Sequence, residues 1–272
     1  MSAKSHQQVK KRDEEFSTKI STRIWDESPS DENPYIASHA RCHGYALTAL
    51  VEKSTLIETL YLLFRGELPD KKEALLLEKL MIFLMNPGPR HPATRAAMNA
   101  GIGKTEPEHI LPIGLTILGG VHLGAGEIET SMRFLRKNFK KPAEDVITML
   151  LKESTAPVEG DWHIAPGFGS RYGSIDIIPN EMASYFSGLN DEWRILKWGC
   201  EFSQGLAPHQ IGWLATGVAA AVFSELGFQP RYGAGLFQLL CAPGLLAHGM
   251  EQSNKPMTAM PFIKDDDYVI EE

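Results

Sequence analysis

The sequence is divided into segments of helical period, and each segment is bounded by residues that start or stop helices. Thr55 with Glu58 and Asp70 with Glu73 form two capping-box patterns, in which a side chain and a backbone N–H exchange hydrogen bonds at the first turn. After each pattern, apolar residues recur every three or four positions, as on the buried face of a helix. The alternating pattern of half-buried strands is nearly absent. The sequence therefore predicts an all-α fold.

Other residues that start or stop helices extend this prediction along the chain. Further helices are expected to begin near Pro107, Pro142, Pro179 and the polar cluster 190–192. Two apolar stretches predict helices over about 211–226, closed by Gly227, and over 232–250. One segment, Phe168–Ile178, is β-branched and glycine-rich, and both a hairpin and an irregular loop remain open for it.

Composition and charge narrow the classes of protein to which the chain can belong. Of its 272 residues 43% are hydrophobic and 22% are charged, which is typical of a folded globular protein. A net charge of −7 argues against a general nucleic-acid-binding surface. The three cysteines are far apart in sequence, which argues against a disulfide framework or a structural zinc site.

The ends of the chain and its hydrophobic runs bear on its location. Residues 1–18 are polar and charged, so we expect a flexible N-terminal tail rather than a signal peptide. Because no run of about 18 uncharged apolar residues occurs, no membrane span is expected. The sequence therefore predicts a cytoplasmic protein.

Three short segments place a histidine or an arginine beside glycines or at a predicted helix edge: 90–92, 120–127 and 166–171. Glycine lets a ligand approach the backbone closely, and helix N-termini offer N–H groups to anions. Taken singly, a histidine of this kind is more often a packed structural residue than a catalytic one. Their order along the chain carries more information than any one of them.

Five segments match the motifs of one enzyme family in the same order. Residues 41–47 look like its RGYDL element, and residues 55–69 resemble its most specific segment, which ends in GELP. Residues 121–127 are similar to HGGANE, residues 166–169 to PGFGH, and residues 245–252 to the closing WLAHWLEQ helix. The chain thus resembles a divergent member of the citrate synthase / citryl-CoA lyase superfamily.

The resemblance implies a fold and an assembly. A large helical domain would comprise residues 19–127 and 236–272, and a smaller helical domain, residues 128–235, would close over the active-site cleft. It also implies a homodimer formed through helices of the large domain.

The resemblance further implies an enzyme, a lyase or acyltransferase that makes or cleaves a carbon–carbon bond next to a coenzyme A (CoA) thioester. Its substrates would be a CoA thioester and a small carboxylic or oxo acid, without a metal. His122 would hydrogen-bond the thioester carbonyl, His91 would contact the acceptor, and Arg171 would hold a carboxylate. The loop expected to lie against coenzyme A consists of Gly167, Phe168 and Gly169.

Three positions depart from the family pattern and imply altered catalytic residues and an altered substrate with fewer carboxylates. Ser170 replaces the histidine of PGFGH, and we expect it to serve as a hydrogen-bond donor in catalysis. The aspartate that acts as the base falls on Ile211, and an arginine falls on Cys241. Glu127 and His209 are the alternative bases that remain.

Because isoleucine cannot accept a proton, a second hypothesis stays open. The chain would then be a non-catalytic scaffold that binds an acyl-CoA, or a subunit that partners a paralogue. The role of Trp162 and His163, which precede the glycine loop, is also left open by the sequence.

Overall fold

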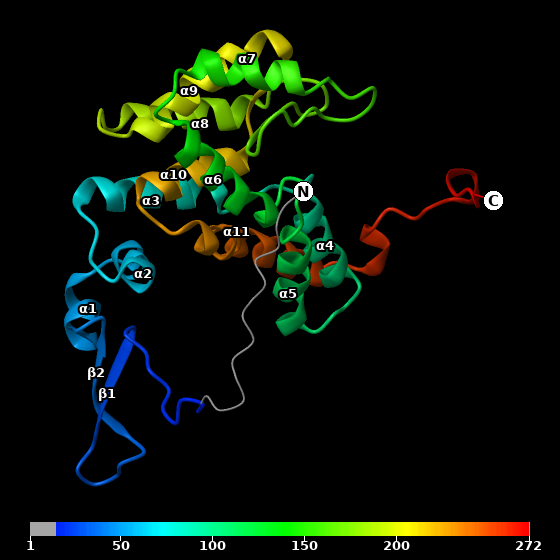
Figure 1. Ribbon diagram of the computed structural model, residues 1–272. Helices are drawn as coiled ribbons and strands as arrows, with labels where there is room; N and C mark the ends of the chain where they lie inside the picture. The colour runs from blue at the N-terminus through cyan, green and yellow to red at the C-terminus, as the bar shows by residue number, and fades with distance from the viewer. Residues whose placement is uncertain (1–14, 272) are drawn as a thin grey trace. The chain divides into compact units, whose positions relative to one another are not determined.

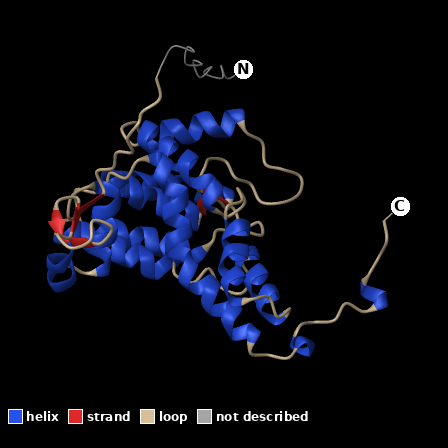
Figure 2. Ribbon diagram, turned by 90° about the horizontal axis from the view of Figure 1, so that it is seen from below, coloured by secondary structure: helices blue, strands red, loops and turns tan. Residues whose placement is uncertain are grey.

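The computed structural model describes residues 15–271, so residues 1–14 of the predicted tail lie outside the described part. Within the described residues there are eleven α-helices and five short strands, which Figure 2 shows in blue and red. The predicted all-α class is confirmed. Backbone proximity divides the chain into two compact units, residues 1–67 and 68–272. The predicted domain boundaries at 127/128 and 235/236 stay a prediction.

The first unit contains a small antiparallel sheet and two helices. The sheet comprises β1 (Trp25–Pro29), β2 (Ala37–Cys42) and β3 (Tyr45–Ala46) in that order, and α1 (Leu47–Lys53) and α2 (Leu56–Arg65) follow.

This sheet was not predicted, for a physical reason. All five residues of β1 are exposed, so the strand carries no alternation of apolar and polar side chains. His43 and Gly44 form the two-residue connection between β2 and β3, and both have positive φ (46° and 85°). Two consecutive positive φ angles are typical of the tight hairpin turn that matches strand twist.

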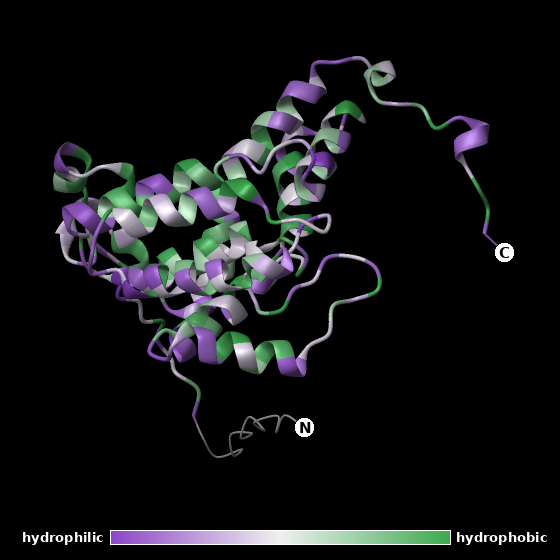
Figure 3. Cartoon of the chain, turned by 90° about the horizontal axis from the view of Figure 1, so that it is seen from above, coloured by the Kyte–Doolittle hydropathy of each residue, from purple (hydrophilic) through white to green (hydrophobic). Residues whose placement is uncertain are grey.

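The second unit is a helical assembly, and its helices are α3 (Lys71–Leu84), α4 (Pro92–Ile102), α5 (Pro107–Leu118), α6 (Ile128–Asn138), α7 (Ala143–Glu153), α8 (Ile177–Gly188), α9 (Arg194–Leu206), α10 (Ala215–Glu225) and α11 (Pro230–Ser253). The long α11 packs on α4, α5 and α6, while α10 packs on α6 and α9 (Figure 1). Helices α7, α8 and α9 pack together beyond α10. Many of these helices carry apolar and polar residues on different faces (Figure 3).

The predicted helix starts are confirmed where local chemistry sets them. Both capping boxes form: Thr55 accepts from the Glu58 N–H at 3.2 Å, and Asp70 accepts from the Glu73 N–H at 2.8 Å. Helix α5 begins at Pro107, as predicted. In each case the deciding residues lie within one turn of the helix end.

The start of α10 differs from the prediction. The apolar stretch predicted a helix from about Ile211, but α10 begins at Ala215. The preceding strand β5 (Gly212–Trp213) pairs antiparallel with β4 (Phe168–Gly169), so its backbone is used in a tertiary ladder instead. This pairing holds the glycine loop against the start of α10.

Helix α11 is long and apolar enough to cross a membrane by length and composition alone. Of its most apolar window, 44% is buried inside the fold, against α4, α5 and α6. The core helix of a helical protein passes the same test, so this is weak evidence for a span.

Candidate active site

The glycine loop is fixed by close backbone contacts. Gly167 has φ +82°, and a Cβ atom there would lie 2.5 Å from the Gly217 Cα of α10. The Leu214 N–H donates to the Gly167 carbonyl at 3.0 Å. Only glycine permits both the left-handed backbone and this close approach, which explains why position 167 is a glycine.

The ring of Phe168 belongs to the core rather than to a cavity. It is fully buried, with the rings of Trp213 and Phe202 at centroid distances of 4.3 and 4.8 Å. The Gly167 N–H donates to the Glu127 carboxylate, and the Phe168 N–H donates to the Ala165 carbonyl. The predicted contact of Gly167, Phe168 and Gly169 with coenzyme A stays a prediction.

Glu127 ends the glycine-rich turn before α6 (residues 119–127) and connects this turn to two other parts of the site. One carboxylate oxygen accepts from the Gly167 N–H at 3.0 Å, and the other accepts from the Thr216 hydroxyl at 2.6 Å. Burial alone would raise the pKa of Glu127, but the nearby His163 and these two hydrogen bonds outweigh burial and lower the pKa. Glu127 is therefore an ionised anchor at neutral pH, and a poor general base.

His163 lies between Glu127 and the glycine loop. Its Nδ1 atom is 3.9 Å from the Glu127 carboxylate, which raises the pKa of His163 above its ordinary value of 6.5. A Cβ atom on Gly169 would lie 2.9 Å from the His163 ring. The Nε2 atom of His163 is buried and has no hydrogen-bond partner among the described residues.

His122 stacks on His163, with ring centroids 5.9 Å apart and an interplanar angle of 28°. The two histidines share a hollow with Val121, Glu127 and Asp161. The structure thus brings the predicted His122 next to the predicted glycine loop, through a histidine whose role the sequence left open. The position of His163 directly before the loop was the only signal for it.

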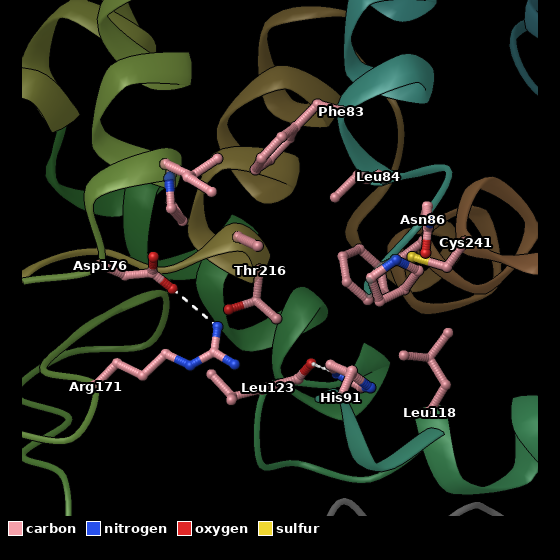
Figure 4. Close-up of a pocket in the computed structure, with 15 residues that line it drawn as sticks. Phe83, Leu84, Asn86, His91, Leu118, Leu123, Arg171, Asp176, Thr216 and Cys241 are labelled. Atoms are coloured by element: carbon pink, nitrogen blue, oxygen red, sulfur yellow. Dashed lines mark hydrogen bonds and ion pairs between the residues drawn. The ribbon is translucent and has the colours of Figure 1, made fainter. Parts of the chain in front are cut away.

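A second hollow adjoins this cluster, with a volume of about 200 Å³. Figure 4 shows it with His91 and Arg171 on one side and Phe83 and Leu84 on the other. Its lining comes from α3, the turn before α4, the end of α5, the glycine-rich turn, the segment after the glycine loop, the starts of α8 and α10, and α11.

His91 is the N-cap of α4, and both of its ring nitrogens make hydrogen bonds to backbone groups. Nδ1 accepts from the Ala93 N–H at 3.1 Å, so the ring proton is assigned to Nε2, which lies 3.1 Å from the Leu123 carbonyl. Burial lowers the pKa of His91, and the positive charge of Arg171 lowers it further. His91 is therefore a neutral ring that lines the cavity, and its predicted contact with an acceptor stays a prediction.

Arg171 extends into the same cavity. Its Nη1 atom bonds the Asp176 carboxylate at 3.0 Å, and the two side chains are 31% and 19% exposed. Asp176 immediately precedes α8 and was not a sequence candidate. The predicted carboxylate-binding role of Arg171 stays a prediction, and it would use the part of the guanidinium that Asp176 leaves uncovered.

Three sequence candidates, Ser170, Ile211 and His209, lie outside both hollows, whereas Cys241 lines the second one. The Ser170 oxygen accepts from the Trp162 N–H at 2.9 Å, and the Ser170 N–H donates to the Trp162 carbonyl. Ile211 is fully buried, and the exposed His209 lies edge-on to the Trp162 ring at 6.2 Å. The predicted catalytic role of Ser170 stays a prediction, but its backbone and side chain both bond Trp162, in the irregular segment that precedes the glycine loop.

Neither protein-family models nor curated protein sequences match the chain. Solved structures do: a citryl-CoA lyase from Hydrogenobacter thermophilus superposes with a TM-score of 0.75 at 23% identity, over 93% of this chain and 95% of that one. The chain has a citrate synthase-like fold. This confirms the resemblance at the level of the fold.

Two other enzymes share this citrate synthase-like fold. An ATP citrate lyase from Methanothrix soehngenii, in complex with citrate and coenzyme A, matches with a TM-score of 0.70 at 16% identity, over 95% of this chain and 44% of that one. A citrate synthase from Thermotoga maritima MSB8 matches with a TM-score of 0.56 at 19% identity, over 79% and 59%.

Proposed function

We propose that the chain is a citryl-CoA lyase-like enzyme that makes or cleaves a carbon–carbon bond next to a CoA thioester. The observation that carries the proposal is the position of His122, which stacks on His163 beside the glycine loop. A fold shared with a structure bound to citrate and coenzyme A supports it. The second substrate would be a small carboxylic or oxo acid.

Making or cleaving this carbon–carbon bond requires two functions from the cluster of His122 and His163. A neutral donor must stabilise the oxygen of the thioester enolate, and a second group must carry a proton to or from the α-carbon. His122 takes the first task in this proposal. His163 takes the second in this proposal, because the Glu127 carboxylate raises the pKa of its imidazole above 6.5, whereas Ile211 cannot titrate.

The test is exchange of solvent deuterium into the α-carbon of acetyl-CoA or propionyl-CoA, followed by mass spectrometry. We expect exchange with the intact protein and a loss of about 10²–10⁴-fold in His122→Ala and in His163→Gln. His39→Gln, on the exposed strand β2, is the matched control and should leave exchange unchanged. Absence of acyl-CoA binding by calorimetry across several thioesters would contradict the proposal.

Specific observations favour a second candidate, a non-catalytic acyl-CoA-binding scaffold or a subunit that partners a paralogue. Ile211 is fully buried, and the Ser170 oxygen already accepts from a backbone N–H. Calorimetric binding of a CoA thioester without any deuterium exchange would favour this candidate. Exchange that depends on His122 would exclude it.

The assembly and location belong to the same proposal. A homodimer, formed through helices of the large domain (residues 19–127 and 236–272), and a cytoplasmic location are proposed from the family resemblance and the sequence. Closure of residues 128–235 over the cleft is likewise proposed, since it would exclude water from the enolate.

A further inference from the structure

The charges around the cavity beside His91 nearly cancel. Among its lining residues Arg171 is the one cation, and Asp176 bonds it at 3.0 Å. The other titratable lining groups are uncharged, because burial lowers the pKa of His91 and raises the pKa of Cys241 to about 12. The cavity therefore presents one partly compensated positive charge to a ligand.

The rest of the cavity wall is mostly apolar. The larger aliphatic and aromatic side chains that line it are those of Phe83, Leu84, Leu118, Leu123, Ile178 and Phe237. An apolar cavity of about 150 Å³ is sufficient for benzene, and this one has about 200 Å³. The space therefore accommodates an apolar group of about four to six carbons next to one carboxylate.

A ligand with two or three carboxylates does not suit this wall. Each further carboxylate would lose its hydration against Leu and Phe side chains without gaining a cation, and burying an unpaired charge is strongly unfavourable. One carboxylate can bond the guanidinium face that Asp176 leaves uncovered. An alkyl or aryl group can then fill the apolar side.

We propose that the non-CoA substrate of this site is a monocarboxylic 2-oxo acid with an apolar substituent, rather than a di- or tricarboxylic acid. The role as substrate rests on the proposed function, whereas binding in the cavity does not. In the cleavage direction, R–C(OH)(COO⁻)–CH₂–CO–S–CoA would give R–CO–COO⁻ and CH₃–CO–S–CoA. The electron pair of the broken bond goes to the thioester α-carbon, and the hydroxyl proton is balanced by the proton that this carbon gains.

The test is calorimetric titration of the whole protein, without coenzyme A, with straight-chain 2-oxo acids from pyruvate to 2-oxooctanoate and with oxaloacetate. We expect affinity to rise about fourfold per methylene until the cavity is full, and 2-oxohexanoate to bind more tightly than oxaloacetate. Tighter binding of oxaloacetate, no dependence on chain length, or no binding of any acid with or without coenzyme A would overturn the proposal.

Substitutions of residues that line the cavity test whether the acids bind there. Arg171→Gln should weaken every acid about tenfold or more, and Phe83→Ala should flatten the dependence on chain length. Asp176→Asn should strengthen binding of all the acids and of oxaloacetate most, and this partly exposed position keeps the test valid if Phe83→Ala fails to fold. If Asp176→Asn leaves the relative affinity for oxaloacetate unchanged, the charge argument is wrong.

The outcome separates this inference from the proposed function. Deuterium exchange without dependence on chain length would contradict the inference alone. Dependence on chain length without any acyl-CoA binding would contradict the proposed function and leave the cavity as a monocarboxylate site. If octanoyl-CoA displaces the 2-oxo acids and acetyl-CoA does not, the cavity holds the acyl chain, and the proposal is wrong.

Discussion

Glu127 is the residue on which the geometry of the candidate site most depends. Its 3₁₀ turn (Ala125–Glu127) is bonded through one buried carboxylate to the glycine loop and to the first turn of α10. Hydrogen bonds to a charged group are stronger than those between neutral groups. The carboxylate therefore acts as a clamp between segments that are about 40 and 90 residues away in the sequence.

We expect Glu127→Gln to lower the free energy of unfolding by about 1.5–3 kcal/mol. The amide has one acceptor oxygen, so its NH₂ group would face either the Gly167 N–H or the Thr216 hydroxyl. Urea denaturation measures the change. The control is Glu129→Gln, which removes an exposed i,i+4 pair with Arg133 and should cost less than about 1 kcal/mol. Equal losses in the two variants would contradict the clamp.

The Glu127–His163 pair also predicts a pH dependence. His163 has a raised pKa, so its stabilisation is complete below 6.5 and is lost as pH rises through the folded-state value. Glu127 has a lowered pKa, so its stabilisation is complete above 4.5 and is lost as pH falls through the folded-state value. The pair is therefore most stabilising between these two ordinary values.

Thermal unfolding checks this prediction. The difference in Tm between the unchanged protein and His163→Gln should be largest between about pH 4.5 and 6.5 and should shrink at higher pH. His39→Gln, on the exposed strand β2, should give no such trend. A constant difference across the whole range would mean that His163 acts through packing alone.

At the scale of elements, helix starts and strands differ in how far the sequence predicts them. The capping boxes at Thr55 and Asp70 were predicted correctly because all the partners lie within one turn. Strand β5 was missed because it exists only through its pairing with β4, more than 40 residues earlier. The β1–β2 hairpin was missed because its exposed strands need no apolar alternation.

The contact between α10 and the glycine loop gives the element-scale prediction. A Cβ atom on Gly217 would lie 2.1 Å from the Gly167 carbonyl oxygen, and a backbone atom cannot move aside by changing a rotamer. We expect Gly217→Ala to destabilise the protein by about 3 kcal/mol, although alanine favours helices. Gly235→Ala in α11 meets nothing within 4 Å and should stabilise it by up to about 1 kcal/mol. Urea denaturation of both variants should give opposite signs.

At the scale of the whole molecule, the family resemblance predicts a homodimer. Helix α5 lies within residues 19–127, and its Ile113 and Ile117 side chains are 37% and 47% exposed one turn apart. Contiguous exposed apolar residues are typical of interaction surfaces. We therefore expect light scattering to give twice the chain mass of 30.2 kDa.

Ile117→Glu should shift this mass toward that of the single chain, because an interface would bury the new charge. Met149→Glu on α7 has a similar exposure of 43% and lies in residues 128–235, so it should leave the mass unchanged. A single-chain mass for the unchanged protein would contradict the predicted dimer.

The sequence by itself determined the helical class, the helix ends set by capping boxes and prolines, and the order of motifs that led to the citrate synthase-like fold. These features depend on periodicity and on hydrogen bonds within one turn, which are local. Only the tertiary structure decided that His163 and Asp176 belong to the candidate site, that the Phe168 ring is core, and that the Ser170 oxygen braces a backbone. Those outcomes depend on contacts between distant segments, because packing and charge pairing in three dimensions have no local sequence signal.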